Sequence, residues 1–170
     1  VRARAAAPFL AAQVGTVLFV NLHSRDLLDD ALFAPDAPLS AIAHRVVLEI
    51  TERAPLTDID DLARRIADLR AMGFRLAIDD LGAGYAAMWA LTVMEPEIVK
   101  IDMSLVRGVD LNPTKRSIVQ HLVAMSHDSG ALVVAEGVET EAERVALVSL
   151  ECDFLQGYLL GRPVKALPWE

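Results

Sequence analysis

Short apolar segments alternate with segments of helical pattern along the whole chain, and this alternation limits the folds that are open to it. Hydrophobic residues make up 54% of the 170 residues and aromatic residues only 5%, so the core must consist largely of aliphatic side chains. Such a composition suits helices packed on a parallel sheet, which indicates an α/β fold. The apolar segments predicted to be strands are residues 16–22, 46–50, 74–78, 98–102, 131–135, 153–155 and 158–160.

Capping residues and glycines mark the helix boundaries. Thr57 is predicted to cap a helix that Gly73 ends, and Pro113 is predicted to open another. Thr140 and Glu143 have the spacing of a capping box, which indicates the start of a further helix. The residues of that helix expected to face inward are Val145, Leu147, Val148 and Leu150. Shorter helices are predicted at residues 2–13, 24–33 and 85–91.

Charge and cysteine content exclude several classes of protein. The formal net charge of −8 disfavours binding to a nucleic-acid backbone, so DNA is not an expected partner. Residues 5–22 carry no charge, but Pro8 and Gln13 interrupt the run, so we predict neither a signal peptide nor a membrane span. The single cysteine, Cys152, is predicted to be a small buried hydrophobe, which fits a reducing, cytoplasmic location.

Polar side chains stand at or just after the carboxyl ends of the predicted strands. In a (β/α) barrel these ends share one face, and that face carries the chemistry. The adjacent Asp79 and Asp80 repel each other unless a cation or a proton compensates their charge. Carboxylate and amide oxygens favour hard cations such as Mg²⁺ or Mn²⁺, and a set of this size can hold two of them. The residues at these positions are Asn21, Glu49, Asp79, Asp80, Lys100, Glu136, Glu139 and Gln156.

Ordinary structural roles compete with this interpretation. Taken alone, Glu49, Glu52 and Lys100 are more often solvated or snorkelling charges at a strand end. The acids at helix starts, Glu143 among them, are assigned to capping without a catalytic role. The histidines lack the spacing of a metal site and are predicted to lie in loops or at the surface: His23, His44, His121 and His127.

Six ordered motifs carry a resemblance to one family. They are Asn21-Leu22, Glu49-Ile50-Thr51-Glu52, the stretch from Asp79 to Tyr85, Lys100-Ile101-Asp102, the stretch from Ala135 to Thr140, and Gln156-Gly157-Tyr158. In this order they resemble the EAL-domain cyclic di-GMP phosphodiesterases, from about Gln13 to Pro163. The resemblance implies a TIM-like (β/α) barrel of the EAL type, formed by a single domain over residues 1–170.

The resemblance also implies a role for each matched residue. Two ions, Mg²⁺ or Mn²⁺, would be bound by Asn21, Glu49, Asp79, Asp80 and Glu136. The residues implied to be catalytic are Lys100, Glu139 and Asp80. Supporting roles are implied for Glu52, Asp102 and Gln156. In this scheme Asp80 is shared between the ions, Lys100 holds the attacking water, and Glu52 anchors the loop after Asp80.

Two features depart from the family pattern. The Glu-Ala-Leu segment that names the family has no counterpart before Asn21, and position 1 is not methionine, so we expect an N-terminal truncation that removes the opening strand and one metal ligand. The loop after the paired aspartates has Leu81, Ala83, Ala86 and Ala87 where the family usually has Phe, Thr and two Ser. The fragment by itself is therefore expected to be weakly active or inactive, and to need a partner over its open side.

Two functions follow from these residues. The first is metal-dependent hydrolysis of cyclic di-GMP to linear pGpG by a two-metal mechanism in the intact protein, which would be a cyclic-guanylate-specific phosphodiesterase. The alternative is a catalytically degenerate EAL domain that acts as a cyclic di-GMP-binding or signalling module. The resemblance further implies a homodimer, with fused sensor or signalling domains outside this chain.

Overall fold

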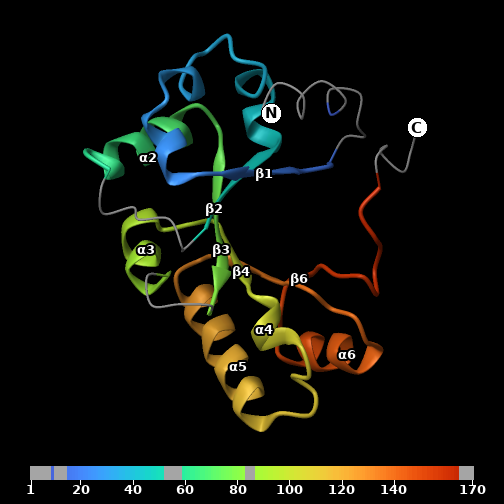
Figure 1. Cartoon of the computed structure of the whole chain (residues 1–170). Helices are drawn as coiled ribbons and strands as arrows, with labels where there is room; N and C mark the ends of the chain where they lie inside the picture. The colour runs from blue at the N-terminus through green and yellow to red at the C-terminus, as the bar shows by residue number, and fades with distance from the viewer. Residues whose placement is uncertain (1–8, 10–14, 52–58, 83–86, 165–170) are drawn as a thin grey trace. The chain divides into compact units, whose positions relative to one another are not determined.

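The computed structural model describes residue 9 and residues 15–51, 59–82 and 87–164 (Figure 1). The chain divides into two compact units, residues 1–77 with 164–170, and residues 78–163. Six strands follow one another in chain order in the sheet, which makes the fold α/β as predicted. The strands are β1 Leu18–Leu22, β2 Val46–Thr51, β3 Arg75–Leu81, β4 Ile98–Ile101, β5 Leu132–Ala135 and β6 Phe154–Leu155.

Helices alternate with these strands. The 3-10 helices η1 Ser24–Leu28, η2 Asp30–Leu32 and η3 Ser40–Arg45 lie between β1 and β2. The α-helices are α2 Leu62–Ala71, α3 Ala87–Met94, α4 Met103–Val106, α5 Pro113–Asp128 and α6 Glu141–Ser149. In the described ranges, no helix combines the length and the apolar character needed to cross a membrane.

In the first unit, β1 pairs in parallel with β2, and Asn21 lies opposite Glu49 in the register. The apolar stripe predicted for α2 is present, because its Leu62, Ile66 and Leu69 are all buried. Their spacing of three and four residues places them on one face of the helix. The stripe therefore anchors α2 in the core of this unit.

In the second unit, β4 pairs in parallel with β5, and β5 pairs in parallel with β6. α4, α5 and α6 lie beside these strands in Figure 1. One core cluster joins the sheet to the helices, through Ile101 and Val133 of the strands, Val119 and Val123 of α5, and Leu147 of α6. This packing gives the ends of β4 and β5 a rigid support.

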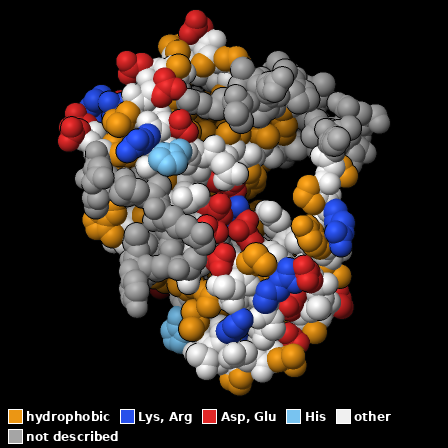
Figure 2. Space-filling model, in the orientation of Figure 1, with side chains coloured by type: hydrophobic (Ala, Val, Ile, Leu, Met, Phe, Trp, Pro, Cys, Tyr) orange, Lys and Arg blue, Asp and Glu red, His pale blue; other side chains and the backbone are white. Residues whose placement is uncertain are grey.

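Most predicted elements of the second unit are confirmed, but two expectations were wrong. Residues 158–160 form a turn, in which Leu160 N–H donates to Gly157 O at 3.0 Å, rather than a strand. On α6, Val145 and Val148 are 54% and 53% exposed, while Ala146 and Leu147 are buried. The helical period of 3.6 residues turns the two valines to the exposed face of α6. Figure 2 shows that, on the side of the second unit facing the viewer, hydrophobic side chains are interspersed with charged ones.

Several other predictions concern the first part of the chain. The helix predicted over residues 24–33 consists of η1 and η2, and Asp29 caps η2 by accepting a hydrogen bond from Ala31 N–H. Apart from Phe9, the helix predicted at residues 2–13 lies outside the described residues, as do Glu52 and Thr57.

Candidate functional site

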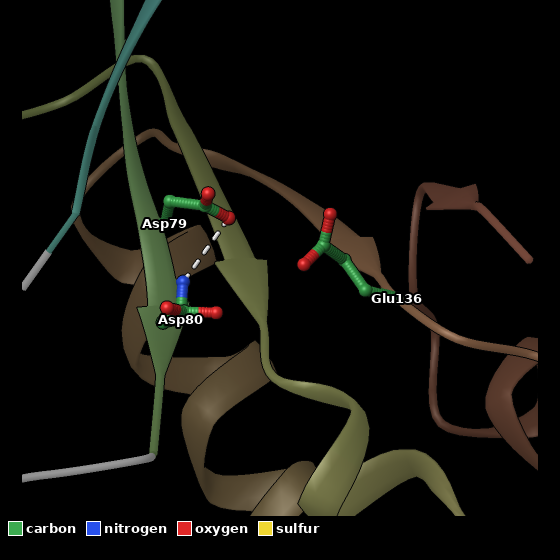
Figure 3. Close-up of side chains that lie close together, drawn as sticks. All are labelled: Asp79, Asp80 and Glu136. Atoms are coloured by element: carbon green, nitrogen blue, oxygen red, sulfur yellow. Dashed lines mark hydrogen bonds between the residues drawn. The ribbon is translucent and has the colours of Figure 1, made fainter. Parts of the chain in front are cut away.

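Asp79 and Asp80 lie near the carboxyl end of β3. The three residues before them, Leu76 to Ile78, are at most 1% exposed, whereas both aspartates are half-buried. Asp80 has a φ of 62°, a left-handed conformation that Asp tolerates better than most residues. Its N–H donates to Asp79 Oδ1 at 3.1 Å, so the backbone itself orients the first carboxylate (Figure 3).

Glu136 completes a group of three carboxylates in the second unit. It follows β5 directly, and its N–H donates to Ile101 O at the end of β4, at 3.1 Å. Asp79, Asp80 and Glu136 each offer an oxygen, and these oxygens lie within 4.8 Å of one another (Figure 3). Three convergent carboxylates are a donor set that fits a hard divalent cation. We call this group the carboxylate cluster.

Lys100 on β4 lies directly beside the carboxylate cluster. Its Nζ is 3.0 Å from Asp79 Oδ1 and 2.6 Å from Glu136 Oε1. The residue is only 5% exposed. A buried ammonium needs such partners, and the carboxylates need a cation, so each stabilises the charge of the other.

Backbone hydrogen bonds hold the residues that follow the strands of the second unit. Asp102 N–H donates to Leu81 O at 3.1 Å, and Gln156 N–H donates to Ala135 O at 2.9 Å. The Asp102 side chain accepts from Ser104 N–H at 2.9 Å and so caps α4. Gln156 is exposed, and the supporting roles of both side chains stay predictions.

The remaining predicted metal ligands, Asn21 and Glu49, belong to the first unit. They are register partners on β1 and β2, with Glu49 6% exposed and Asn21 exposed. The structure therefore places these two side chains next to each other on adjacent strands. Their part in metal binding stays a prediction.

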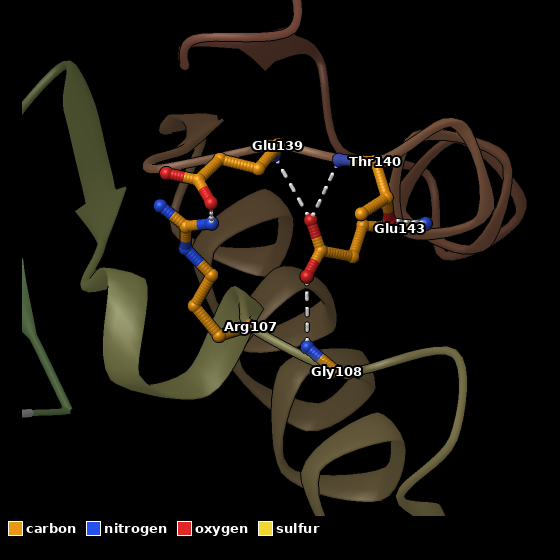
Figure 4. A network of polar contacts seen from close by, with 5 residues as sticks. All are labelled: Arg107, Gly108, Glu139, Thr140 and Glu143. Atoms are coloured by element: carbon orange, nitrogen blue, oxygen red, sulfur yellow. Dashed lines mark hydrogen bonds and ion pairs between the residues drawn. The ribbon is translucent and has the colours of Figure 1, made fainter.

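Glu139, a predicted catalytic residue, lies on the loop after Glu136 and forms an ion pair with Arg107 (Figure 4). The hydrogen bond from Arg107 lowers the pKa of the Glu139 carboxyl, which keeps it ionised. Arg107 was not foreseen from the sequence, because nothing local in the sequence links it to a partner 32 positions later. The catalytic role of Glu139 stays a prediction.

Glu143 holds the same loop from the other side. Its carboxylate accepts hydrogen bonds from the N–H groups of Gly108, Glu139 and Thr140, at 2.9, 2.9 and 3.1 Å (Figure 4). Burial acts to raise the pKa of Glu143, but these donors outweigh it and lower the pKa. The capping role predicted for Glu143 is confirmed. The bond to Gly108 adds a tie between α6 and the turn after α4.

Three other titratable side chains behave as the sequence suggested. Cys152 is buried, and burial raises its pKa to about 12, so its thiol is unreactive at neutral pH. His127 Nε2 lies 2.9 Å from Asp153 Oδ2 at the surface of the second unit. His23 caps η1 by accepting a hydrogen bond from Arg25 N–H. None of these residues belongs to the carboxylate cluster.

Comparison with known proteins shows the family. The sequence model of the EAL domain matches residues 2–163, and the chain therefore belongs to the EAL domain family. It is 34% identical over 155 residues to the cyclic di-GMP phosphodiesterase RocR of Pseudomonas aeruginosa, covering 86% of this chain and 38% of RocR. It is 36% identical over 121 residues to the cyclic di-GMP phosphodiesterase PdeF of Escherichia coli, covering 71% of this chain and 16% of PdeF.

Solved structures show the same fold. The crystal structure of the EAL domain of Mycobacterium smegmatis DcpA has 30% sequence identity and a TM-score of 0.86, over 95% of this chain and 76% of that one. Klebsiella pneumoniae BlrP1, solved as a manganese/cy-diGMP complex, has 35% identity and a TM-score of 0.81, over 95% of this chain and 43% of that one. The predicted TIM-like barrel fold of the EAL type is thereby confirmed. The chain spans less than half the length of the curated relatives that it matches.

Proposed function

We propose that this chain is the catalytic domain of a metal-dependent phosphodiesterase that hydrolyses cyclic di-GMP to linear pGpG. The observation that carries the proposal is the carboxylate cluster, with the ammonium of Lys100 in contact with Asp79 and Glu136. The similarity to proteins named cyclic di-GMP phosphodiesterases, and to an EAL protein solved with manganese and cy-diGMP, supports the choice of substrate.

The carboxylate cluster would hold divalent metal, with Asn21 and Glu49 as further ligands. All these donors are oxygens, and the cluster contains neither histidine nor cysteine, a donor set that favours Mg²⁺ or Mn²⁺ over zinc. We propose two ions, with Asp80 shared between them. When bound, such ions activate water and neutralise the charge that develops on the phosphate oxygens.

The residues of the chain then orient the reacting groups. An ammonium is a donor only, so Lys100 Nζ would hold the attacking water by a hydrogen bond to its oxygen. A carboxylate of the cluster would accept a hydrogen bond from the same water. This second hydrogen bond would orient the water so that a lone pair of the water oxygen points at phosphorus. A bond from the water oxygen to phosphorus would form and the bond from phosphorus to the ribose 3′ oxygen would break. The proton lost by the water would pass to the carboxylate, and the 3′ oxygen would take up a proton, which opens the ring to pGpG.

A degenerate binding module is the alternative function. It is favoured by the loop after the paired aspartates, where Ala83, Ala86 and Ala87 supply none of the hydroxyls usual at these positions. Such a domain would bind cyclic di-GMP through the same face and leave it intact.

The setting of the domain is also proposed. The relatives are longer than this chain, which supports fused sensor or signalling domains in the same polypeptide. The helices described do not include one that could span a membrane, which is compatible with a cytoplasmic location. We further propose a homodimer.

Product analysis distinguishes the two functions. Incubation of the intact protein with cyclic di-GMP and Mn²⁺ or Mg²⁺, followed by chromatography, should yield pGpG. Saturable binding of cyclic di-GMP with the dinucleotide recovered unchanged would support the binding module instead. A protein that neither binds nor hydrolyses cyclic di-GMP would contradict both functions.

A further inference from the structure

The backbone of the loop that carries Glu136 and Glu139 is tied down at several points. Val138 N–H donates to Gln156 O at 3.0 Å, and Val138 O accepts from Leu159 N–H at 3.1 Å. Glu143 accepts the N–H groups of Glu139 and of the next residue. These bonds fix where the Cα of Glu139 lies, but they leave its side chain free to rotate.

The Glu139 side chain is 42% exposed and forms an ion pair with Arg107. The backbone of Arg107 is fixed, since its N–H donates to Met103 O at 2.9 Å and its carbonyl accepts from Lys115 Nζ at 2.7 Å. The following N–H, that of Gly108, is bound by Glu143. The guanidinium therefore extends from a rigid base toward Glu139 (Figure 4).

The loop lies close against α4 at Gly137. A Cβ at that position would lie 2.6 Å from Met103 Cβ and 3.7 Å from Arg107 Nε, and the φ of 74° also favours glycine. Arg107 Nε is buried without a hydrogen-bond partner among the described residues. A buried donor without a partner costs free energy, so stability alone does not account for the way in which this guanidinium is placed.

We propose that Arg107 is a positioning residue, which fixes the rotamer of Glu139 on the loop that also carries Glu136 and thereby sets the rate of turnover. The inference rests on the proposed phosphodiesterase function. A planar guanidinium fixes the direction of a carboxylate, whereas an ammonium supplies charge with little directional preference. Lysine at position 107 should therefore restore activity only in part.

The test measures kcat and KM for cyclic di-GMP in the protein with Arg107→Ala, Arg107→Lys, Glu139→Gln and the double change Arg107→Ala with Glu139→Gln. Arg107→Ala should lower kcat about 10-fold to 100-fold, as is usual for residues that orient active-site groups, and change KM less than about 3-fold. Arg107→Lys should lie between Arg107→Ala and wild type. The double variant should be no slower than Glu139→Gln, because both changes act through one side chain.

Arg144→Ala is the matched control. Arg144 forms a similar ion pair with Glu141, at 2.6 Å, on the exposed face of α6, and its loss should leave kcat unchanged. A wild-type kcat in Arg107→Ala would overturn the proposal. A double variant whose loss of kcat equals the product of the two single losses would overturn it as well. If circular dichroism shows that Arg107→Ala does not fold, the kcat of Arg107→Lys becomes the test. A wild-type kcat in Arg107→Lys would then overturn the proposal.

A readout besides turnover separates this inference from the proposed function. Arg107→Ala should let the Glu139 side chain sample several χ1 rotamers, seen in NMR three-bond couplings, and leave amide hydrogen exchange at Val138 and Glu139 unchanged, because the ion pair holds the side chain and other bonds hold the backbone. Rotamer populations of Glu139 that stay as in wild type would overturn the positioning role even in an active protein. Absence of pGpG formation by the wild-type protein would refute the proposed function, and the rotamer measurement would still decide whether Arg107 positions Glu139.

Discussion

At the scale of residues, the carboxylate cluster depends on one departure from strand geometry. Successive side chains of a regular strand point to opposite faces, which would separate Asp79 from Asp80. The left-handed backbone of Asp80 interrupts this alternation, and its N–H orients the Asp79 carboxylate instead. Lys100 then offsets the repulsion between the acids that meet there.

Lys100 is predicted to act on the rate rather than on substrate affinity. Lys100→Met keeps most of the stem and removes the ammonium, which lies between Asp79 and Glu136. A group that holds the attacking water acts mainly in the transition state, so kcat should fall roughly 100-fold while KM changes little. Steady-state kinetics with cyclic di-GMP measure both constants. A change confined to KM would contradict the role assigned to Lys100.

At the scale of elements, the loops after the strands are locked together by close backbone contact. Gly157 lies against Val138 so tightly that a Cβ would be 2.1 Å from Val138 O. Val138 in turn bonds to the backbone of Gln156 and Leu159. The loop that presents Glu136 and the turn after β6 therefore behave as one unit.

Gly157→Ala is predicted to destabilise this unit. The added methyl group would overlap backbone atoms, which cannot move aside as a flexible side chain can, so the unfolding free energy should fall by about 2–3 kcal/mol. Gly161→Ala is the control, because nothing lies within 4 Å of a Cβ there. Urea denaturation compares the two variants. Equal stability of both would show that the contact at Gly157 is relaxed in solution.

The hydrogen bond between His127 and Asp153 predicts a dependence of stability on pH. Burial acts to raise the pKa of Asp153, but hydrogen bonds from His127 and from Val133 N–H hold it below its ordinary value of 3.8. A folded-state pKa below the unfolded value means that the contribution is present above about pH 4 and is lost as the pH falls through the folded pKa. Asp153→Asn should therefore lower the unfolding free energy at pH 7, with a smaller deficit near pH 3.

Urea denaturation of wild type and Asp153→Asn at both pH values measures this difference. Asp128→Asn is a suitable control, because it removes the same charge as Asp153→Asn at the position next to His127 in the sequence. A deficit that stays constant from pH 7 to pH 3 would contradict the assignment.

The local pattern of the sequence was enough to predict some elements and not others. Residues 46–50 and 131–135 form apolar runs between clear breaks, and the observed strands differ from the predictions by one residue at most. The prediction of a strand at residues 158–160 was wrong, because the turn depends on the close approach of Gly157 to Val138. That contact joins separate parts of the chain and leaves no local signal in the sequence. Arg107 was missed for the same reason, since its partner lies on a different element.

At the scale of the whole molecule, membership of the EAL family and the carboxylate cluster lead to one central claim. The cluster lies entirely within the second unit, on the residues that follow β5 and on the end of β3. Asn21 and Glu49, on adjacent strands of the first unit, are the further ligands that we propose. The claim is that divalent metal held by these residues is required for hydrolysis of cyclic di-GMP.

The initial rate of pGpG formation as a function of Mn²⁺ concentration, for wild type and Asp79→Asn, tests this claim most directly. Asn keeps the size of the side chain and removes its charge, so the fold should persist while metal affinity falls. We expect a saturable dependence on Mn²⁺ for wild type, abolished by a chelator, and a rate at least about 100-fold lower for Asp79→Asn. Equal rates for the two proteins, or wild-type hydrolysis that survives the chelator, would contradict the account.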